Sequence, residues 1–231
     1  MDDLELTAAQ ARVLGSMLEK QMTTPDAYPL TLKALTTACN QTSSRDPIVQ
    51  YEPSQVETTV LALKGKGLAR VVHPGSGERA TKYRQVLDEV LDITPAERAL
   101  ICVLLLRGAQ TVNELKTRTE RMHEFGPTAD VEAALDAMSR RDPPLVARVD
   151  RAPGQREGRW IQLLEVGAEA RAAAAATATA TASITPTNRE PGRVDALEAR
   201  VTALESRVAA LSEALGDPSG EVSGQEPTAM S

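Results

Sequence analysis

The chain has few aromatic residues and few of the side chains that most often do chemistry. Of its 231 residues, 2% are aromatic, two are cysteine and two are histidine. Neither cysteine lies in a metal-ligand spacing, and no Gly-rich phosphate loop or recognisable nucleophile setting is present. We therefore expect no catalytic residue, no metal and no cofactor, and an enzyme is the weakest of three interpretations.

Long hydrophobic runs are also missing. The longest apolar run spans residues 99–106, whereas a membrane-spanning helix needs about 20 residues. The acidic start of the chain lacks the basic segment of a signal peptide, so we expect a soluble cytoplasmic protein. Cys39 and Cys102 each lie in an apolar helical pattern, which indicates buried, reduced thiols rather than a disulfide.

The chain has no basic excess. Residues 1–90 hold 10 Lys and Arg against 11 Asp and Glu, residues 91–165 hold 11 against 12, and residues 166–231 hold 5 against 9. Phosphate neutralisation supplies most of the affinity of non-specific duplex binding. Any contact with DNA must therefore come from a local basic patch.

What the chain does contain is an internal repeat. The pattern of residues 7–18 recurs at 94–105, and Val56-Glu57 followed by Leu-Ala-Arg-Val71 recurs as Val131-Glu132 followed by Val-Ala-Arg-Val149. Each copy predicts three helices and then two strands around a polar Gly-bearing loop, which is the element order of a winged helix. We predict an α+β fold, mainly α with small β wings, made of two tandem winged-helix domains at residues 1–90 and 91–165.

Capping-box patterns mark four helix starts. They are Thr7 with Gln10, Ser54 with Glu57, Thr94 with Glu97, and Thr111 with Glu114. The first copy predicts helices at 7–21, 30–39 and 54–66 and strands at 68–73 and 82–86; the second predicts helices at 95–107, 111–122 and 128–140 and strands at 145–149 and 159–163. The wings are then residues 74–80 and 150–158.

The last part of the chain changes character. Residues 166–193 are rich in Ala, Thr and Pro and predict a flexible linker, and residues 216–231 predict a disordered tail. Between them a heptad seam predicts a short coiled coil at 194–215, with Val194, Leu197, Val201, Leu204, Val208, Leu211 and Leu215 as dimerisation positions. Val at a and Leu at d favour a parallel homodimer. Docking of this helix on its own domains is the alternative.

The third helix of a winged helix usually enters the major groove of DNA. In the first copy its candidate contacts are Gln55, Thr58, Thr59, Lys64 and Lys66, while Val56, Leu61 and Leu63 are predicted on its core side. The third helix of the second copy carries Asp130, Glu132 and Asp136, which is more typical of a protein contact.

Both predicted wings are basic. Arg79, Lys82 and Arg84 lie at the first, and Arg151, Arg156 and Arg159 flank the second beside Trp160. Either wing is able to bind phosphate. A solvated hairpin with ordinary surface charges, and with Trp160 packed on its own core, is an equally strong interpretation.

Three further polar segments have structural and functional interpretations. Residues 39–47 suit turn chemistry or a binding loop, and residues 24–30 suit a rigid joint with a buried Tyr28 ring. Arg118 and Arg121 suit an interdomain brace more than a phosphate contact.

Several ordered segments together resemble the bacterial YceH family. They are Arg12-Val-Leu-Gly15, Glu19-Lys20, Thr24-Pro-Asp-Ala-Tyr-Pro-Leu30, Ala38-Cys-Asn-Gln41, Cys102-Val-Leu-Leu-Leu-Arg-Gly108, Glu114-Leu-Lys-Thr-Arg-Thr-Glu-Arg121 and Arg151-Ala-Pro-Gly-Gln-Arg-Glu157. The resemblance covers about residues 4–164 and implies two winged-helix domains. It implies little about function and carries over no catalytic residue.

The leading hypothesis is a dimeric winged-helix protein that binds double-stranded DNA, with transcriptional regulation as the role to expect of it. The alternative is a protein-interaction adaptor that uses the winged helices and the coiled coil as docking surfaces for a protein partner.

Overall fold

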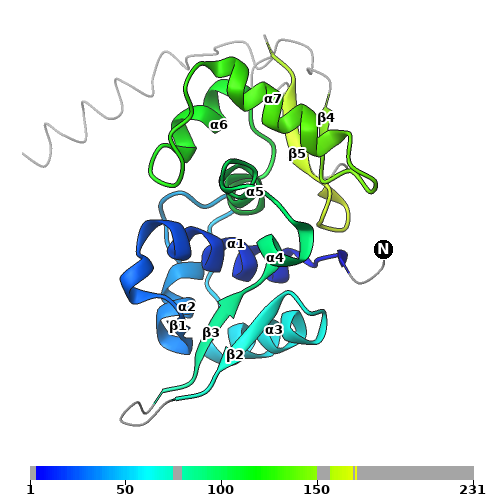
Figure 1. Cartoon of the computed structure of the whole chain (residues 1–231). Coiled ribbons are helices and arrows are strands. Elements are labelled where there is room, and N and C mark those ends of the chain that lie inside the picture. Colours follow the sequence, from blue (N-terminus) through cyan, green and yellow to red (C-terminus); the bar gives the residue numbers. More distant parts are fainter. Residues whose placement is uncertain (1–3, 75–79, 150–156, 169, 171–231) are drawn as a thin grey trace, which may run out of the picture. The chain divides into compact units, whose positions relative to one another are not determined.

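The computed structural model describes residues 4–74, 80–149, 157–168 and 170, and its element order repeats (Figure 1). The first half holds α1 (Ala8–Thr23), the 3-10 turn η2 (Pro25–Ala27), β1 (Leu30–Thr31), α2 (Leu32–Cys39), α3 (Pro53–Gly65), β2 (Ala69–Val72) and β3 (Lys82–Gln85). The short helix α4 (Leu87–Leu91) follows. The second half holds α5 (Pro95–Arg107), α6 (Val112–Thr119), α7 (Thr128–Ser139), β4 (Val146–Val149) and β5 (Arg159–Gln162).

Both halves pair their strands in the same order. In the first, β3 lies between β1 and β2, antiparallel to each, so that Tyr83 faces Leu30 on one side and Val71 on the other. In the second, β5 pairs with β4, and an isolated bridge joins Gln110 to Trp160 where the first half has β1. The described part of the chain is therefore a mixed α/β fold with small antiparallel sheets, consistent with a winged-helix-like arrangement.

Three of the four predicted capping boxes are confirmed. The hydroxyls of Thr7, Thr94 and Thr111 each accept a backbone N–H at the third helical position, and the side chain of that residue reaches back. The box predicted at Ser54 is wrong. Helix α3 begins at Pro53, whose fixed φ and missing N–H suit the first helical position, and Gln55 Oε1 instead accepts the N–H of Glu52 at 2.8 Å.

The predicted helix at 30–39 begins too early, because Leu30 and Thr31 form β1 and the hydroxyl of Thr31 caps α2. Helix α4 is not among the helices predicted from the sequence. Leu61 was predicted on the core side of α3, but it is 46% exposed. The buried side of α3 consists of Val56, Val60 and Leu63, whose spacing of four and three follows the helical period.

Helix α5 is buried almost all round and packs along α1. Every residue from 99 to 106 is buried, which is typical of a helix that lies inside a core. Gly15 of α1 makes the approach close, because a Cβ there would lie 3.0 Å from Leu106 and 3.1 Å from Leu105. The thiol of Cys102 donates to the carbonyl of Gly15 at 3.4 Å. The first helices of the two halves thus share one core (Figure 1).

Backbone hydrogen bonds also join segments far apart in the sequence. The N–H of Leu6 donates to the carbonyl of Leu164 at 2.7 Å, and the N–H of Val166 donates to the carbonyl of Leu6 at 3.0 Å. All described residues fall within one compact unit. The division into domains at residue 90 stays a prediction.

The predicted coiled coil at 194–215, with its seven dimerisation positions, and the tail lie outside the described residues, as does most of the predicted linker. Where the chain is described, no helix is both long and apolar enough to cross a membrane. The prediction of buried thiols is confirmed, since Cys39 and Cys102 are free and buried. Burial raises the pKa of Cys39 to about 11.

The contact between α1 and α5 predicts the effect of a larger side chain at position 15. We expect Gly15→Val to lower the free energy of unfolding by about 1–3 kcal/mol, because overpacking forces the neighbouring leucines to shift. Gly65→Val is the matched control, since a Cβ at Gly65, also in a helix, would contact nothing within 4 Å. Urea unfolding of the two variants measures the difference; equal stabilities would contradict the close approach.

Candidate functional site

Helix α3 presents a polar face to solvent. Its buried residues hold it against the core, and Gln55, Thr58 and Lys64 lie exposed on the other side, as predicted. Thr59 and Lys66 are half-buried, and the Thr59 hydroxyl donates to the carbonyl of Gln55 at 2.7 Å. The Thr59 hydroxyl is therefore bonded within α3. Gln55, Thr58 and Lys64 remain as the exposed side chains through which the helix can contact a partner.

The β2–β3 hairpin next to α3 adds cations. Lys82 is half-buried at the start of β3, and Arg79 lies outside the described residues. Arg70 on β2 and Arg84 on β3 both pair with Glu89 of α4, at 3.4 and 2.7 Å. Sequence reasoning missed Arg70, although strand alternation places it outward between Ala69 and Val71.

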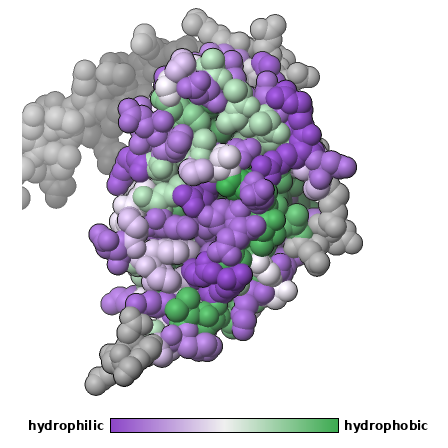
Figure 2. Space-filling model, viewed as in Figure 1, coloured by the Kyte–Doolittle hydropathy of each residue, from purple (hydrophilic) through white to green (hydrophobic). Residues whose placement is uncertain are grey.

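The α3–hairpin surface, defined as the described residues from 53 to 85, is locally basic. It holds Lys64, Lys66, Arg70, Lys82 and Arg84 against one carboxylate, Glu57. The hairpin loop adds one residue of each sign in the sequence, Glu78 and Arg79. Figure 2 shows hydrophilic side chains over β3 and α4 and a hydrophobic area over β2 on the face it displays. The surface is thus locally basic, with two of its five cations paired with Glu89 of α4.

Helix α7 occupies the corresponding place in the second half and is acidic, whereas α3 itself holds one residue of each sign, Glu57 and Lys64. Val131, Leu135 and Met138 are buried, whereas Asp130, Glu132 and Asp136 are exposed. The nearest cation on the helix is Arg140, which lies 4.0 Å from Asp136. The prediction of an acidic third helix in the second copy is confirmed.

Arg159 is partly engaged within the protein. Its guanidinium donates to the carbonyl of Ala109 and to Glu114, both at 2.9 Å, so it ties β5 to the start of α6. The contact of Arg159 with DNA stays a prediction, and Arg151 and Arg156 lie outside the described residues. Trp160 is 6% exposed, which confirms that it packs on its own core.

Residues 24–30 form the predicted rigid joint. The Tyr28 hydroxyl accepts the backbone N–H of Gln85 at 2.6 Å and so ties η2 to β3. Burial raises the pKa of Tyr28 to about 12, which keeps the phenol neutral.

The predicted brace through Arg118 and Arg121 is wrong. Arg118 pairs with Glu114 of its own helix at 3.4 Å. Arg121 makes no ion pair or side-chain hydrogen bond to any residue that the structure describes.

Residues 40–47 are held by two buried arginines. Arg12 donates to the carbonyls of Cys39 and Pro47, one at each end of the loop. Arg45 donates to the carbonyl of Ala38 and to both carboxylate oxygens of Glu19, at 3.1 and 2.7 Å. Turn chemistry and a binding loop both stay predictions for this segment, because the bonds that hold it come from Arg12 and Arg45 and not from its short polar residues.

Glu19 supplies the negative charge for this loop. Burial by itself would raise the pKa of Glu19, but the hydrogen bonds and charges of Arg45 and Lys20 bring the pKa below its ordinary value. The side chain of Arg45 is 0% exposed. A buried guanidinium needs a paired carboxylate, so Glu19 is ionised in the folded protein.

The sequence matches the model of a family described as "Protein of unknown function, DUF480" over residues 6–155. It is 46% identical over 164 residues to a UPF0502 protein of Shewanella piezotolerans, an alignment that covers 69% of this chain and 75% of the relative. A UPF0502 protein of Geobacter sulfurreducens is 45% identical over 173 residues, with coverage of 73% and 78%. A third, of Citrifermentans bemidjiense, is 48% identical over 158 residues, with coverage of 68% and 73%.

The pair of Glu19 and Arg45 predicts a pH dependence of stability. Because the folded-state pKa of Glu19 is lowered, its contribution is complete above its ordinary value of 4.5 and is lost as the pH falls through the folded-state pKa. We expect Glu19→Gln to cost about 3 kcal/mol at pH 7, since it leaves Arg45 unpaired. The difference from the wild type should shrink steadily below pH 4.5.

Urea unfolding at several pH values between 7 and 3 measures this difference. Asp136→Asn is the control, because it removes an exposed carboxylate with a partner at 4.0 Å, and it should change stability by at most about 0.5 kcal/mol. A Glu19→Gln difference that stays constant across the pH range would contradict the assigned role.

Proposed function

The chain belongs to the bacterial family of unknown function DUF480, whose relatives carry the name UPF0502 protein, and we propose that it is a tandem winged-helix protein that binds double-stranded DNA. The first winged helix, residues 1–90, makes the contact through the α3–hairpin surface. The proposal extends to a homodimer through 194–215, a cytoplasmic location and no catalysis. The identification of this family as YceH stays a prediction; it is consistent with the match to a family of unknown function.

The observation that carries the proposal is the charge of the α3–hairpin surface. Five cations stand there against Glu57 and against Glu89 of α4, which pairs with Arg70 and Arg84, in a chain whose formal net charge is −6. Phosphates attract such a patch and release their counterions. Gln55 and Thr58 then stand on the exposed side of the helix, with amide and hydroxyl groups of the kind that read base edges in the major groove.

A second candidate function is supported by the acidic face of α7. Exposed carboxylates at Glu132 and Asp136 repel a phosphate backbone but suit a basic protein surface. On this alternative the protein is an adaptor and α7 docks a protein partner. The two functions differ in which third helix makes the contact.

We expect Lys64→Glu to weaken the binding of duplex DNA about tenfold and to lower the salt slope of the affinity by about one, because one phosphate contact is lost. Arg140→Glu makes the same charge change on an exposed side chain at the end of α7 and should leave both quantities unchanged. Fluorescence anisotropy against a random-sequence duplex pool over a salt series measures both.

Circular dichroism at the same protein concentrations shows whether both variants keep their fold. Equal losses from Lys64→Glu and Arg140→Glu would show that only net charge matters and would contradict a contact through α3. No binding by the wild type at low salt would reject the DNA function and favour the adaptor.

A further inference from the structure

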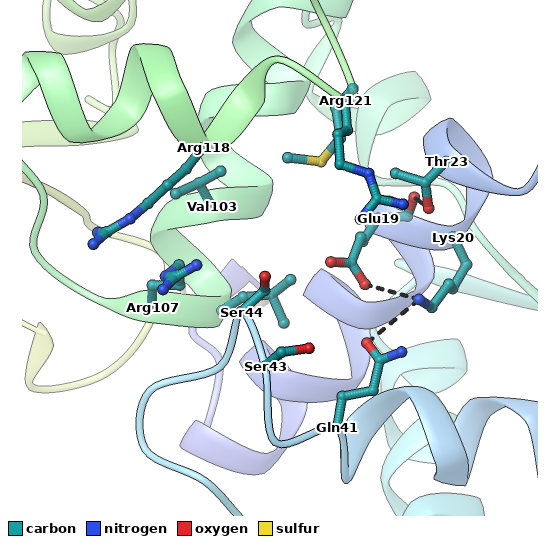
Figure 3. A pocket seen from close by; sticks show the side chains of 12 residues that line it. Glu19, Lys20, Thr23, Gln41, Ser43, Ser44, Val103, Arg107, Arg118 and Arg121 are labelled. Atoms are coloured by element: carbon teal, nitrogen blue, oxygen red, sulfur yellow. Dashed lines mark hydrogen bonds and ion pairs between the residues drawn. The ribbon is translucent and has the colours of Figure 1, made fainter.

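A cavity of about 180 Å³ opens at the junction of the two halves (Figure 3). The first half contributes the C-terminal part of α1 and residues 41–44 of the polar loop. The second half contributes the end of α5, with Arg107, and the end of α6, with Arg118. Side chains from both halves of the repeat therefore face the same space.

Three arginines line the cavity. Arg107 and Arg118 lie next to each other on one side, and Arg121 lies across from them, beside Glu19 and Thr23 (Figure 3). Arg118 has only a 3.4 Å contact with Glu114, a carboxylate that Arg159 already binds at 2.9 Å. Among the residues that the structure describes, Arg107 and Arg121 have no carboxylate or carbonyl partner within hydrogen-bond distance of their guanidinium groups. Arg107 has only the longer-range attraction of Asp46 and Glu114.

The surroundings of Arg107 lower the pKa of its guanidinium group. Burial lowers the pKa of Arg107, and the neighbouring charge of Arg118 lowers it further. The carboxylates of Asp46 and Glu114 act in the opposite direction, but the pKa remains lowered. A cation with a perturbed pKa that faces a cavity is a candidate for a binding site.

The opposite wall supplies polar groups and little free negative charge. Lys20 pairs with Glu19 at 3.2 Å and donates to Gln41 at 3.3 Å, and the two oxygens of Glu19 are already bonded to Arg45. Ser43 and Ser44 place hydroxyl groups at the exposed rim. The one carboxylate on the cavity wall is therefore already neutralised by cations.

We propose that this cavity binds the phosphate group of a small phosphomonoester, with Arg107, Arg118 and Arg121 as its ligands. A carboxylate is planar and a single arginine satisfies it with two parallel hydrogen bonds. Three guanidinium groups around one space instead suit a dianion with three or more acceptor oxygens. The serine hydroxyls at the rim provide further donors to the same oxygens.

The cavity has room for a phosphate group. A cavity needs about 10–15 Å³ to hold one water molecule, and this one has about 180 Å³ on the same scale. A phosphate group, with five non-hydrogen atoms, fits with space to spare. The remainder of a phosphomonoester would extend past Ser43 and Ser44 toward solvent.

Isothermal titration calorimetry with inorganic phosphate and with glycerol phosphate as probes tests this inference without nucleic acid, so it stands apart from the proposed DNA binding. We expect saturable binding of both by the full chain. The double variant Arg107→Gln, Arg121→Gln should lose at least about a factor of ten in affinity, because each lost charge-assisted hydrogen bond is worth about that factor.

Arg140→Gln is the matched control, because Arg140 is exposed on α7 and outside the cavity; it should bind both probes as the wild type does. Sodium chloride at equal ionic strength accounts for screening. Tighter binding of glycerol phosphate than of phosphate identifies a phosphomonoester, and equal binding identifies the free ion. No saturable heat, or unchanged affinity in the double variant, would overturn the assignment.

Thermal unfolding gives a second readout, first in phosphate-free buffer and then with phosphate added. We expect Arg107→Gln to keep or raise the melting temperature, because it removes a charge that burial and Arg118 disfavour. Addition of phosphate should then raise the melting temperature of the wild type and not that of this variant. A clear drop in phosphate-free buffer would make Arg107 a structural residue and reject its role as a ligand.

Discussion

The close contact between α1 and α5 is the constraint on which the rest of the structure depends. Gly15 allows this approach, since a Cβ at position 15 would lie 3.0 Å from Leu106 and 3.1 Å from Leu105, so that these leucines would have to shift. It also buries α5 on nearly every side, so that no face of this helix remains for solvent. Because each helix is the first of its half, this single contact sets how the end of α1 faces the end of α5. The cavity lies at that meeting point.

The polar loop after α2 completes the same junction. Its backbone N–H at Asp46 donates to the carbonyl of Leu106 at 2.9 Å, and so satisfies one of the carbonyls that a helix leaves unpaired at its C-terminus. Arg12 donates to the carbonyl of Pro47 in the loop, and Arg45 of the loop is paired with the carboxylate of Glu19. The two halves are thus joined by apolar packing and by hydrogen bonds that no single half contains.

Local signals in the sequence predicted most elements but not their assembly. Capping boxes and apolar spacing located α5 at the observed residues and the hairpins to within one residue at each end, because these signals act between neighbours in the chain. Leu61 was misplaced because its apolar character outweighed the spacing of Val56, Val60 and Leu63. The pair of Glu114 and Arg118 was overlooked although its i,i+4 spacing is a local signal. The bond of Arg159 to Glu114 was missed because these residues meet only in the folded second half.

On the proposed function, the different charges of the α3–hairpin surface and of α7 limit how the protein engages a duplex. The two helices hold the same place in the two halves, yet α3 exposes both Glu57 and Lys64 beside a basic hairpin, whereas α7 exposes Glu132 and Asp136. Phosphates that approached both at once would gain at the first and lose at the second. On the proposed function, one chain therefore supplies one reading helix, and a second helix on the same duplex must come from another copy of the chain. The homodimer proposed through residues 194–215 meets that requirement.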